Sequence, residues 1–129
     1  MATVNTPVNT LGAASTLTQA AVGTVSQLTS ITTGVTLDNL IGVVTTQAAT
    51  AGAAGATPNT FTVSNSLVKA SSVVVADIVD YGGVIATNGN PFVIVDAVTN
   101  GSFNIIVSNA HGTNALNGTL KIAFQVLAI

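Results

Sequence analysis

Hydrophobic and polar residues alternate along most of the chain with a period of two, which is typical of β-strands. The clearest case is residues 91–108, where Asn100-Gly101 separates two apolar runs and predicts a hairpin with a tight type I′ turn. The second run places three residues on one face, which we expect to be core: Phe103, Ile105 and Val107. The first run, 91–98, is mostly apolar on both faces. We therefore expect it to be covered on both sides, by a second layer or by another subunit.

Further alternating runs, separated by turn residues such as Gly, Asn and Pro, predict six more strands. They lie at residues 23–30, 35–37, 43–47, 59–65, 73–80 and 119–128. No segment has a convincing helical period. About eight short strands with turns between them predict an all-β fold, an antiparallel β-sandwich or jelly roll, formed by residues 23–129.

Residues 1–22 show no such period and consist largely of Thr, Asn, Ala and Ser. We interpret them as an extended N-terminal arm that grips a neighbour by strand addition. Its apolar side chains are the candidate partner-binding anchors: Val4, Val8, Leu11 and Leu17. The alternative is an extra strand or short helix that folds back on its own domain.

Charged residues make up only 5% of the chain, with four Asp and two Lys, against about 25% in an average soluble domain. Because charge normally keeps a free monomer in solution, the deficit favours permanent assembly. Two lysines cannot neutralise a phosphate backbone or recruit an anionic membrane, so we expect no nucleic-acid or membrane partner. The sequence also has no run of about 18 apolar residues, no secretory signal pattern and no Cys.

Candidate chemistry is sparse. Asp77 and Asp80 are the only close carboxylates, and their offset of three predicts opposite faces of a strand, so they do not form a catalytic pair. One His and four dispersed Asp are too few for a zinc or two-metal site. Calcium held by Asp77 or Asp80 with loop carbonyls is the alternative to simple solvated turn aspartates. We therefore expect no enzyme activity, cofactor or small-molecule substrate. His111 is either a pH sensor at an interface or an exposed loop residue.

Three other features each allow two interpretations. Lys69 and Lys121 either pair with acidic residues of a partner or protect strand edges. The small-residue loop 48–58 either lies against a neighbouring surface or is mobile. Asn100-Gly-Ser and Asn117-Gly-Thr match the glycosylation pattern but are more simply interpreted as turns.

Residues 23–127 resemble a β-sandwich module found in virion proteins of tailed bacteriophages. The resemblance rests on the order of several segments rather than on any one of them. These are GTVSQ and TGVTL, then FTVSNS, a Val-rich strand with one acid, AVTNGSF and the closing IAF strand. Similar modules usually carry Thr-Ser-Lys-Ser/Thr where this chain has Thr29-Ser30-Ile31-Thr32, an exchange that marks either a buried subunit contact or drift.

The resemblance implies a structural virion protein. A short chain with an N-terminal arm is most similar to capsid decoration, or cement, proteins, which are typically homotrimers on the outside of the shell, bound to the major capsid protein. Candidate trimer contacts are the exposed parts of strands 91–98 and 119–128. The alternatives are a tail, head-fibre or receptor-binding fibre component, or a non-viral surface or adhesin module.

Overall fold

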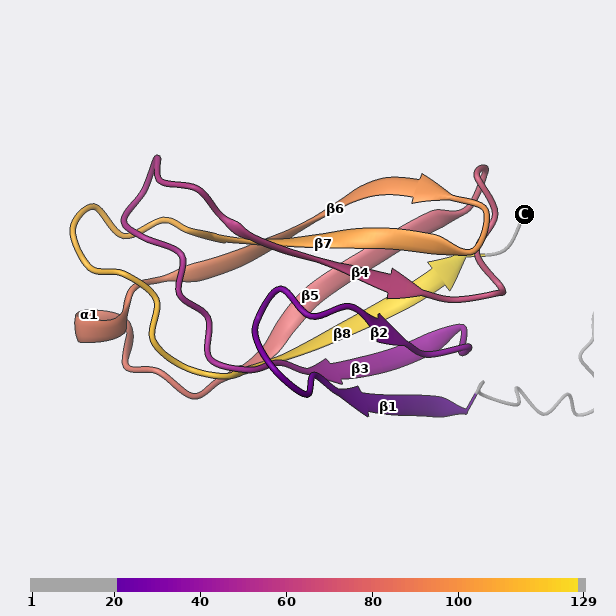
Figure 1. Cartoon of the computed structure of the whole chain (residues 1–129), viewed down its shortest axis with the longest axis horizontal. Helices are drawn as coiled ribbons and strands as arrows, with labels where there is room; N and C mark the ends of the chain where they lie inside the picture. The colour runs from indigo at the N-terminus through magenta and orange to yellow at the C-terminus, as the bar shows by residue number, and fades with distance from the viewer. Residues whose placement is uncertain (1–20, 128–129) are drawn as a thin grey trace, which may run out of the picture.

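The protein is a β-sandwich of two four-stranded sheets, seen here in a computed structural model that describes residues 21–127 (Figure 1). Sheet A has the strand order β1-β3-β8-β5, and sheet B has the order β2-β4-β7-β6. The elements are β1 (Val22–Ser26), β2 (Val35–Thr36), β3 (Ile41–Thr45), β4 (Asn59–Ser64), β5 (Val73–Tyr81), α1 (Ile85–Asn88), β6 (Pro91–Thr99), β7 (Ser102–Asn109) and β8 (Leu120–Leu127). The predicted all-β sandwich of eight strands is confirmed.

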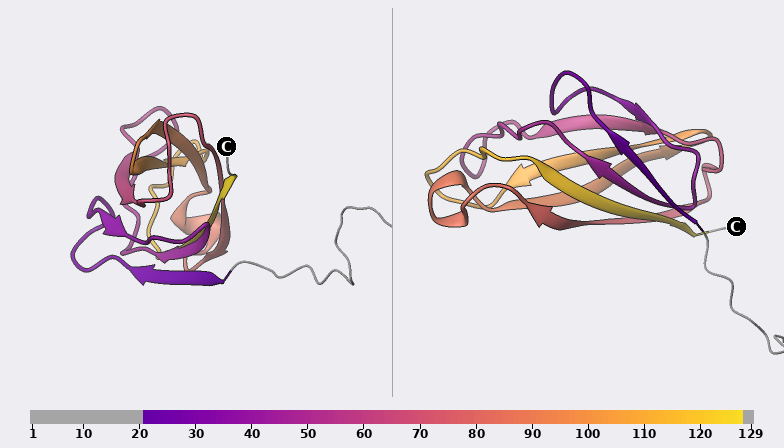
Figure 2. Two further views of the ribbon diagram at one scale, coloured as in Figure 1. Left: turned by 90° about the vertical axis from the view of Figure 1, so that its right-hand side faces the viewer. Right: turned by 90° about the horizontal axis from the view of Figure 1, so that it is seen from below.

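The chain changes sheet after almost every strand, so β1, β3 and β5 lie in sheet A and β2, β4 and β6 in sheet B. Each crossing reverses the chain direction, and two crossings restore it. For that reason β1 pairs with β3, and β2 with β4, in parallel, whereas the other four pairings are antiparallel. The sheets are thus mixed and not purely antiparallel as we predicted. Figure 2 shows the two layers end-on.

The predicted hairpin is confirmed as β6 and β7, but two details of its geometry differ from the prediction. Gly101 has a φ of 88° and Asn100 has no positive φ, so the turn is not type I′, which needs positive φ at both residues. A bulge between Asp96 and Thr99 sets two β6 residues against one of β7. Ala97 adopts a left-handed φ of 51° there. Consequently Val98 turns inward with Val93 and Val95, whereas Ala97 is exposed.

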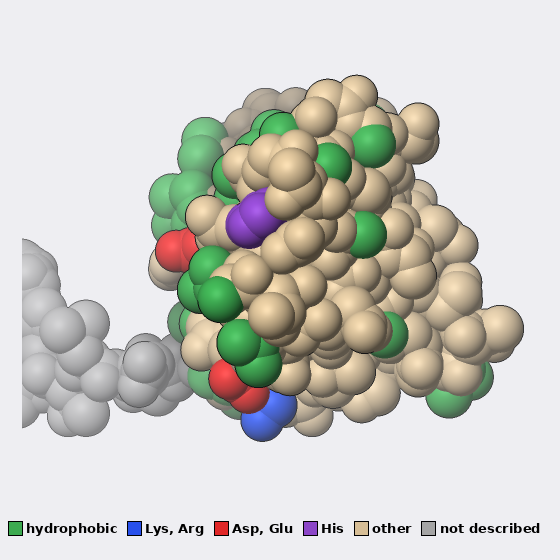
Figure 3. All heavy atoms as spheres, turned by 90° about the vertical axis from the view of Figure 1, so that its left-hand side faces the viewer, with side chains coloured by type: hydrophobic (Ala, Val, Ile, Leu, Met, Phe, Trp, Pro, Cys, Tyr) green, Lys and Arg blue, Asp and Glu red, His purple; other side chains and the backbone are tan. Residues whose placement is uncertain are grey.

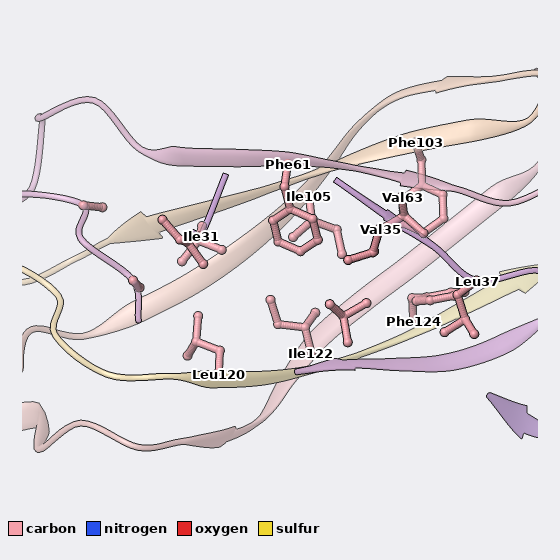
Figure 4. Packing of buried hydrophobic residues seen from close by; sticks show 14 of the residues in the cluster. Ile31, Val35, Leu37, Phe61, Val63, Phe103, Ile105, Leu120, Ile122 and Phe124 are labelled. Carbon is pink, nitrogen blue, oxygen red and sulfur yellow. The ribbon is translucent and has the colours of Figure 1, made fainter. Parts of the chain in front are cut away.

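The core fills the space between the sheets (Figure 4). Phe103, Ile105 and Val107 of β7 are fully buried, as predicted, and face the buried side of β8. Phe103 and Phe124 join the sheets in an edge-to-face contact with ring centroids 5.2 Å apart, a geometry favoured by the aromatic quadrupole. Ile31 lies in the same core. Because Ile31 is buried within its own domain, it does not form a subunit contact. That was the first of the two interpretations of Thr29-Ser30-Ile31-Thr32.

Buried amide side chains hold the connections between strands. Asn109 forms four hydrogen bonds: its Nδ2 donates to the carbonyls of Gly52 and Asn114, and its Oδ1 accepts from the N–H of Asn90 and of His111. Gln27 joins the turn after β1 to the chain after β3 through the Ile31 carbonyl and the Gln47 N–H. Because these loops fold onto each other, the first part of loop 48–58 packs within the domain, with Ala49 and Ala51 buried.

We predict that Gly42→Ala destabilises the fold. A Cβ at Gly42 would lie 2.6 Å from the ring of Phe124 and from Leu37. Overpacking of this kind costs about 1 to 3 kcal/mol of unfolding free energy, measurable by urea denaturation. Gly112→Ala is the control, because a Cβ there meets nothing within 4 Å. Equal stability of the two variants would contradict the packing at Gly42.

Ala97→Gly should stabilise the protein. The left-handed φ of 51° carries a steric cost for any residue with a Cβ. Removing that cost outweighs the extra freedom that Gly gives the unfolded chain, for a net gain of about 0.5 to 1 kcal/mol. Thermal unfolding would show the gain as a higher Tm. Ala115→Gly, in an exposed loop without positive φ, should give none.

Candidate interaction surface

The outer face of sheet A changes from apolar at one end to charged at the other. The strand register aligns outward side chains in rows that cross the sheet. At the apolar end Val73 lies opposite Leu127, and the next row runs Val22, Ile41, Gln125, Val75. Val22, Val73 and Val75 are each about half exposed, at 53%, 56% and 49%. We call these residues the sheet A patch: Val22, Ile41, Val73, Val75, Gln125 and Leu127.

A shallow hollow of about 460 Å³ lies in this face. It forms over Ala123, whose short side chain leaves a gap between the longer side chains of Ile41, Val75 and Gln125. Asp77 lines its polar side. The hollow is therefore lined mostly by aliphatic groups, with one carboxylate and one amide at its margin. Such a lining suits an aliphatic side chain of another segment better than a polar ligand.

At the charged end of the face, Asp77 and Asp80 lie on the same side of the sheet, so the prediction that they lie on opposite faces is wrong. Asp77 lies opposite Ala123 and Asp80 opposite Lys121, and these two β8 residues point to the same side. Strict alternation would place the two carboxylates on opposite faces, but a bulge adds Val79 and returns Asp80 to the face of Asp77. Both are exposed. Lys121 next to Asp80 is a cross-strand pair of opposite charge, a common stabilising pair on sheet surfaces.

The outer face of sheet B is mostly polar. Thr60, Thr62 and Ser64 of β4 point outward, and the Thr62 hydroxyl donates to Oδ1 of Asn104 at 2.8 Å. Its apolar corner is formed by Phe92 and Ile94 at the start of β6, which are exposed and not covered on both sides within the domain. The candidate trimer contacts in strands 91–98 and 119–128 thus lie on the outer faces of different sheets and do not form one continuous surface.

His111 lies at the end of the sandwich near α1 and is half buried (purple in Figure 3). Its Nδ1 accepts hydrogen bonds from the backbone N–H of Thr113, at 3.1 Å, and of Asn114, at 3.0 Å. Both contacts need a lone pair, which places the ring proton on Nε2. Asn114 in turn donates to the Ala86 carbonyl of α1. His111 therefore has a structural role in this loop that neither sequence interpretation anticipated.

Within residues 21–127 no three His, Cys, Asp or Glu side chains are grouped as metal ligands would be. No helix in that range has the length and hydropathy to cross a membrane. The predicted anchors Val4, Val8, Leu11 and Leu17 lie outside the described residues. The sheet A patch, which the sequence analysis did not single out as a unit, is thus the strongest candidate for interaction.

Comparisons with protein-family models, with curated proteins and with solved structures found no match for this chain.

Replacing His111 by Ala should destabilise the loop at the α1 end. The variant removes the acceptor of the N–H groups of Thr113 and Asn114, at a net cost of about 0.5 to 1.5 kcal/mol in unfolding free energy. Thr113→Ala, which removes a hydroxyl that contacts the ring only at 3.5 Å, is the matched control. Urea denaturation measures both. A His111→Ala variant as stable as the parent would disprove the structural role.

Proposed function

We propose that this protein is a structural virion component, a capsid decoration protein that binds the outer surface of a bacteriophage head and stabilises the shell. The observation that carries the proposal is the sheet A patch, a half-exposed apolar surface on a domain with very few charges. Exposed apolar side chains that gather on one face of a domain are a common mark of protein interaction sites. The resemblance of residues 23–127 to virion modules supplies the class of partner, the major capsid protein.

The mechanism is thermodynamic. A protein that binds the assembled shell, and not its dissociated subunits, shifts the assembly equilibrium by mass action and stabilises the shell. In a homotrimer three modest contacts act together, because the second and third form intramolecularly. The anchors Val4, Val8 and Leu11 would widen the contact. This reaction-free role needs no cofactor or catalytic group, in keeping with the few titratable side chains of the chain.

Substitutions of the apolar arm residues test whether the arm contributes to shell binding. We expect the parent protein to sediment saturably with empty shells of the parent phage, and not with dissociated capsid subunits. The variant Val8→Asp/Leu11→Asp should bind shells about tenfold more weakly, since each substitution places a charge where an apolar contact forms. The control Asn5→Asp/Asn9→Asp adds the same charge to the same segment at polar positions, and should bind like the parent.

Three outcomes would contradict the proposal. Equal binding to shells and to free subunits would remove the mass-action mechanism. Binding to tails or to the host surface, with none to shells, would favour the fibre component instead. A loss of shell binding in the Asn5→Asp/Asn9→Asp control as large as in Val8→Asp/Leu11→Asp would show that added negative charge, and not apolar anchoring, governs attachment.

A further inference from the structure

We propose that in the free protein the N-terminal segment, residues 1–20, lies across the sheet A patch of its own chain and covers it. The inference concerns the protein before it meets any partner, so it does not depend on the proposed function. It follows from three properties: where the segment joins the domain, what side chains it carries, and how far it can reach.

The segment joins the domain beside the surface it would cover. It leads through Ala21 into Val22, the first residue of β1 and a member of the patch. Val22 lies opposite Ile41, which lies opposite Gln125, which lies opposite Val75. The segment therefore begins at one end of the most complete row of the patch. The exposed corner of sheet B, with Phe92 and Ile94, belongs to the other sheet.

The composition of the segment matches the surface. Residues 1–20 contain no Asp, Glu, Lys, Arg or His, whereas all the charged side chains of the protein lie between residues 38 and 121. A segment without charged side chains can settle on an apolar face without desolvating any. Its Val and Leu side chains are of the kind that the hollow above Ala123 can hold. The Thr and Asn residues between them would face water.

The distances are short. Four strands about 4.8 Å apart place the outer two about 14 Å from each other. An extended chain covers about 3.3 Å per residue, so the five residues from Leu17 to Val22 already span roughly 17 Å, and the whole segment several times that. Because the segment is tethered, its effective concentration at the patch is in the millimolar range, which favours its own chain over a second copy.

Covering the patch would also solve a physical problem of the free protein. A domain with so few charged residues has little to oppose association through an exposed apolar face. The pair Asp80 and Lys121, beyond the hollow at the charged end of sheet A, would remain in water. The cover would thus hide the apolar end and leave the hydrated end exposed.

The absence of Cys from the chain allows a direct test with single-thiol variants of the full-length protein. Gln125→Cys places a thiol in the centre of the patch, and Thr62→Cys places one on the outer face of sheet B; both positions are exposed in residues 21–127. The rate of modification by a soluble disulfide reagent measures access to each thiol. Val75→Cys, at a half-exposed position of the same patch, replaces Gln125→Cys if that variant fails to fold.

We expect Gln125→Cys to react about tenfold more slowly than Thr62→Cys, because a thiol under a cover reacts only when the cover opens. Adding Leu11→Asp and Leu17→Asp should bring the two rates within about twofold of each other, since charged anchors no longer settle on the patch. The matched control adds Asn9→Asp and Thr18→Asp, the same charge at polar positions of the same segment. It should leave Gln125→Cys protected.

Equal reactivity of Gln125→Cys and Thr62→Cys in the otherwise unchanged chain would overturn the inference. Protection that disappears on dilution would also overturn it, because it would assign the cover to a second copy. Protection that is unchanged by dilution but survives Leu11→Asp and Leu17→Asp would show that these residues do not hold the cover, which is likewise a contradiction. No shells are present in this experiment, so a negative result here does not contradict shell binding. A negative result in the shell-binding experiment likewise does not contradict the covering of the patch.

Discussion

The close packing of the two sheets at Phe124 is the constraint on which the rest of the fold depends. Its ring meets Phe103 edge-to-face from the opposite sheet and lies so close to Gly42 that no Cβ fits between them. This contact brings β8, a central strand of sheet A, against β7, a central strand of sheet B. With the centre fixed, the remaining strands add outward in pairs. The outward side chains of these strands do not take part in the core and are available to contact water or a partner.

The sequence was sufficient for the core and for the strands, and the reason is periodicity. Phe103, Ile105 and Val107 alternate with residues of the opposite face, and a period of two with one buried side has only one stable register. Where the period breaks, the prediction fails. Bulges at Val79 and at Ala97 each insert a residue, and each moves the residues that follow to the other face. The local sequence does not predict these bulges, because Val and Ala also occur in regular strands.

The candidate surface and the buried amides escaped prediction for a different reason, since both depend on contacts between distant segments. The sheet A patch joins β1, β3, β5 and β8, and parallel pairing of β1 with β3 cannot be deduced from either strand alone. Asn109 resembles any turn Asn in the sequence, yet it binds groups from three connections at once. Ile31 lies in a turn of Thr and Ser residues, and only the packing of distant segments shows that it belongs to the core.

The two outer faces of the sandwich differ in polarity, so the molecule has one side suited to an apolar contact and one suited to water. Sheet A carries an apolar end beside the point where the N-terminal segment joins, and sheet B is mostly polar apart from the corner formed by Phe92 and Ile94. In the proposed function the apolar side chains of the arm bind the shell. In the further inference the same side chains first bind the sheet A patch of their own chain. The two are compatible as an exchange, because an arm that leaves the patch uncovers a second apolar surface at the moment of contact. Attachment would then gain the patch as well as the arm, while the free protein exposes neither.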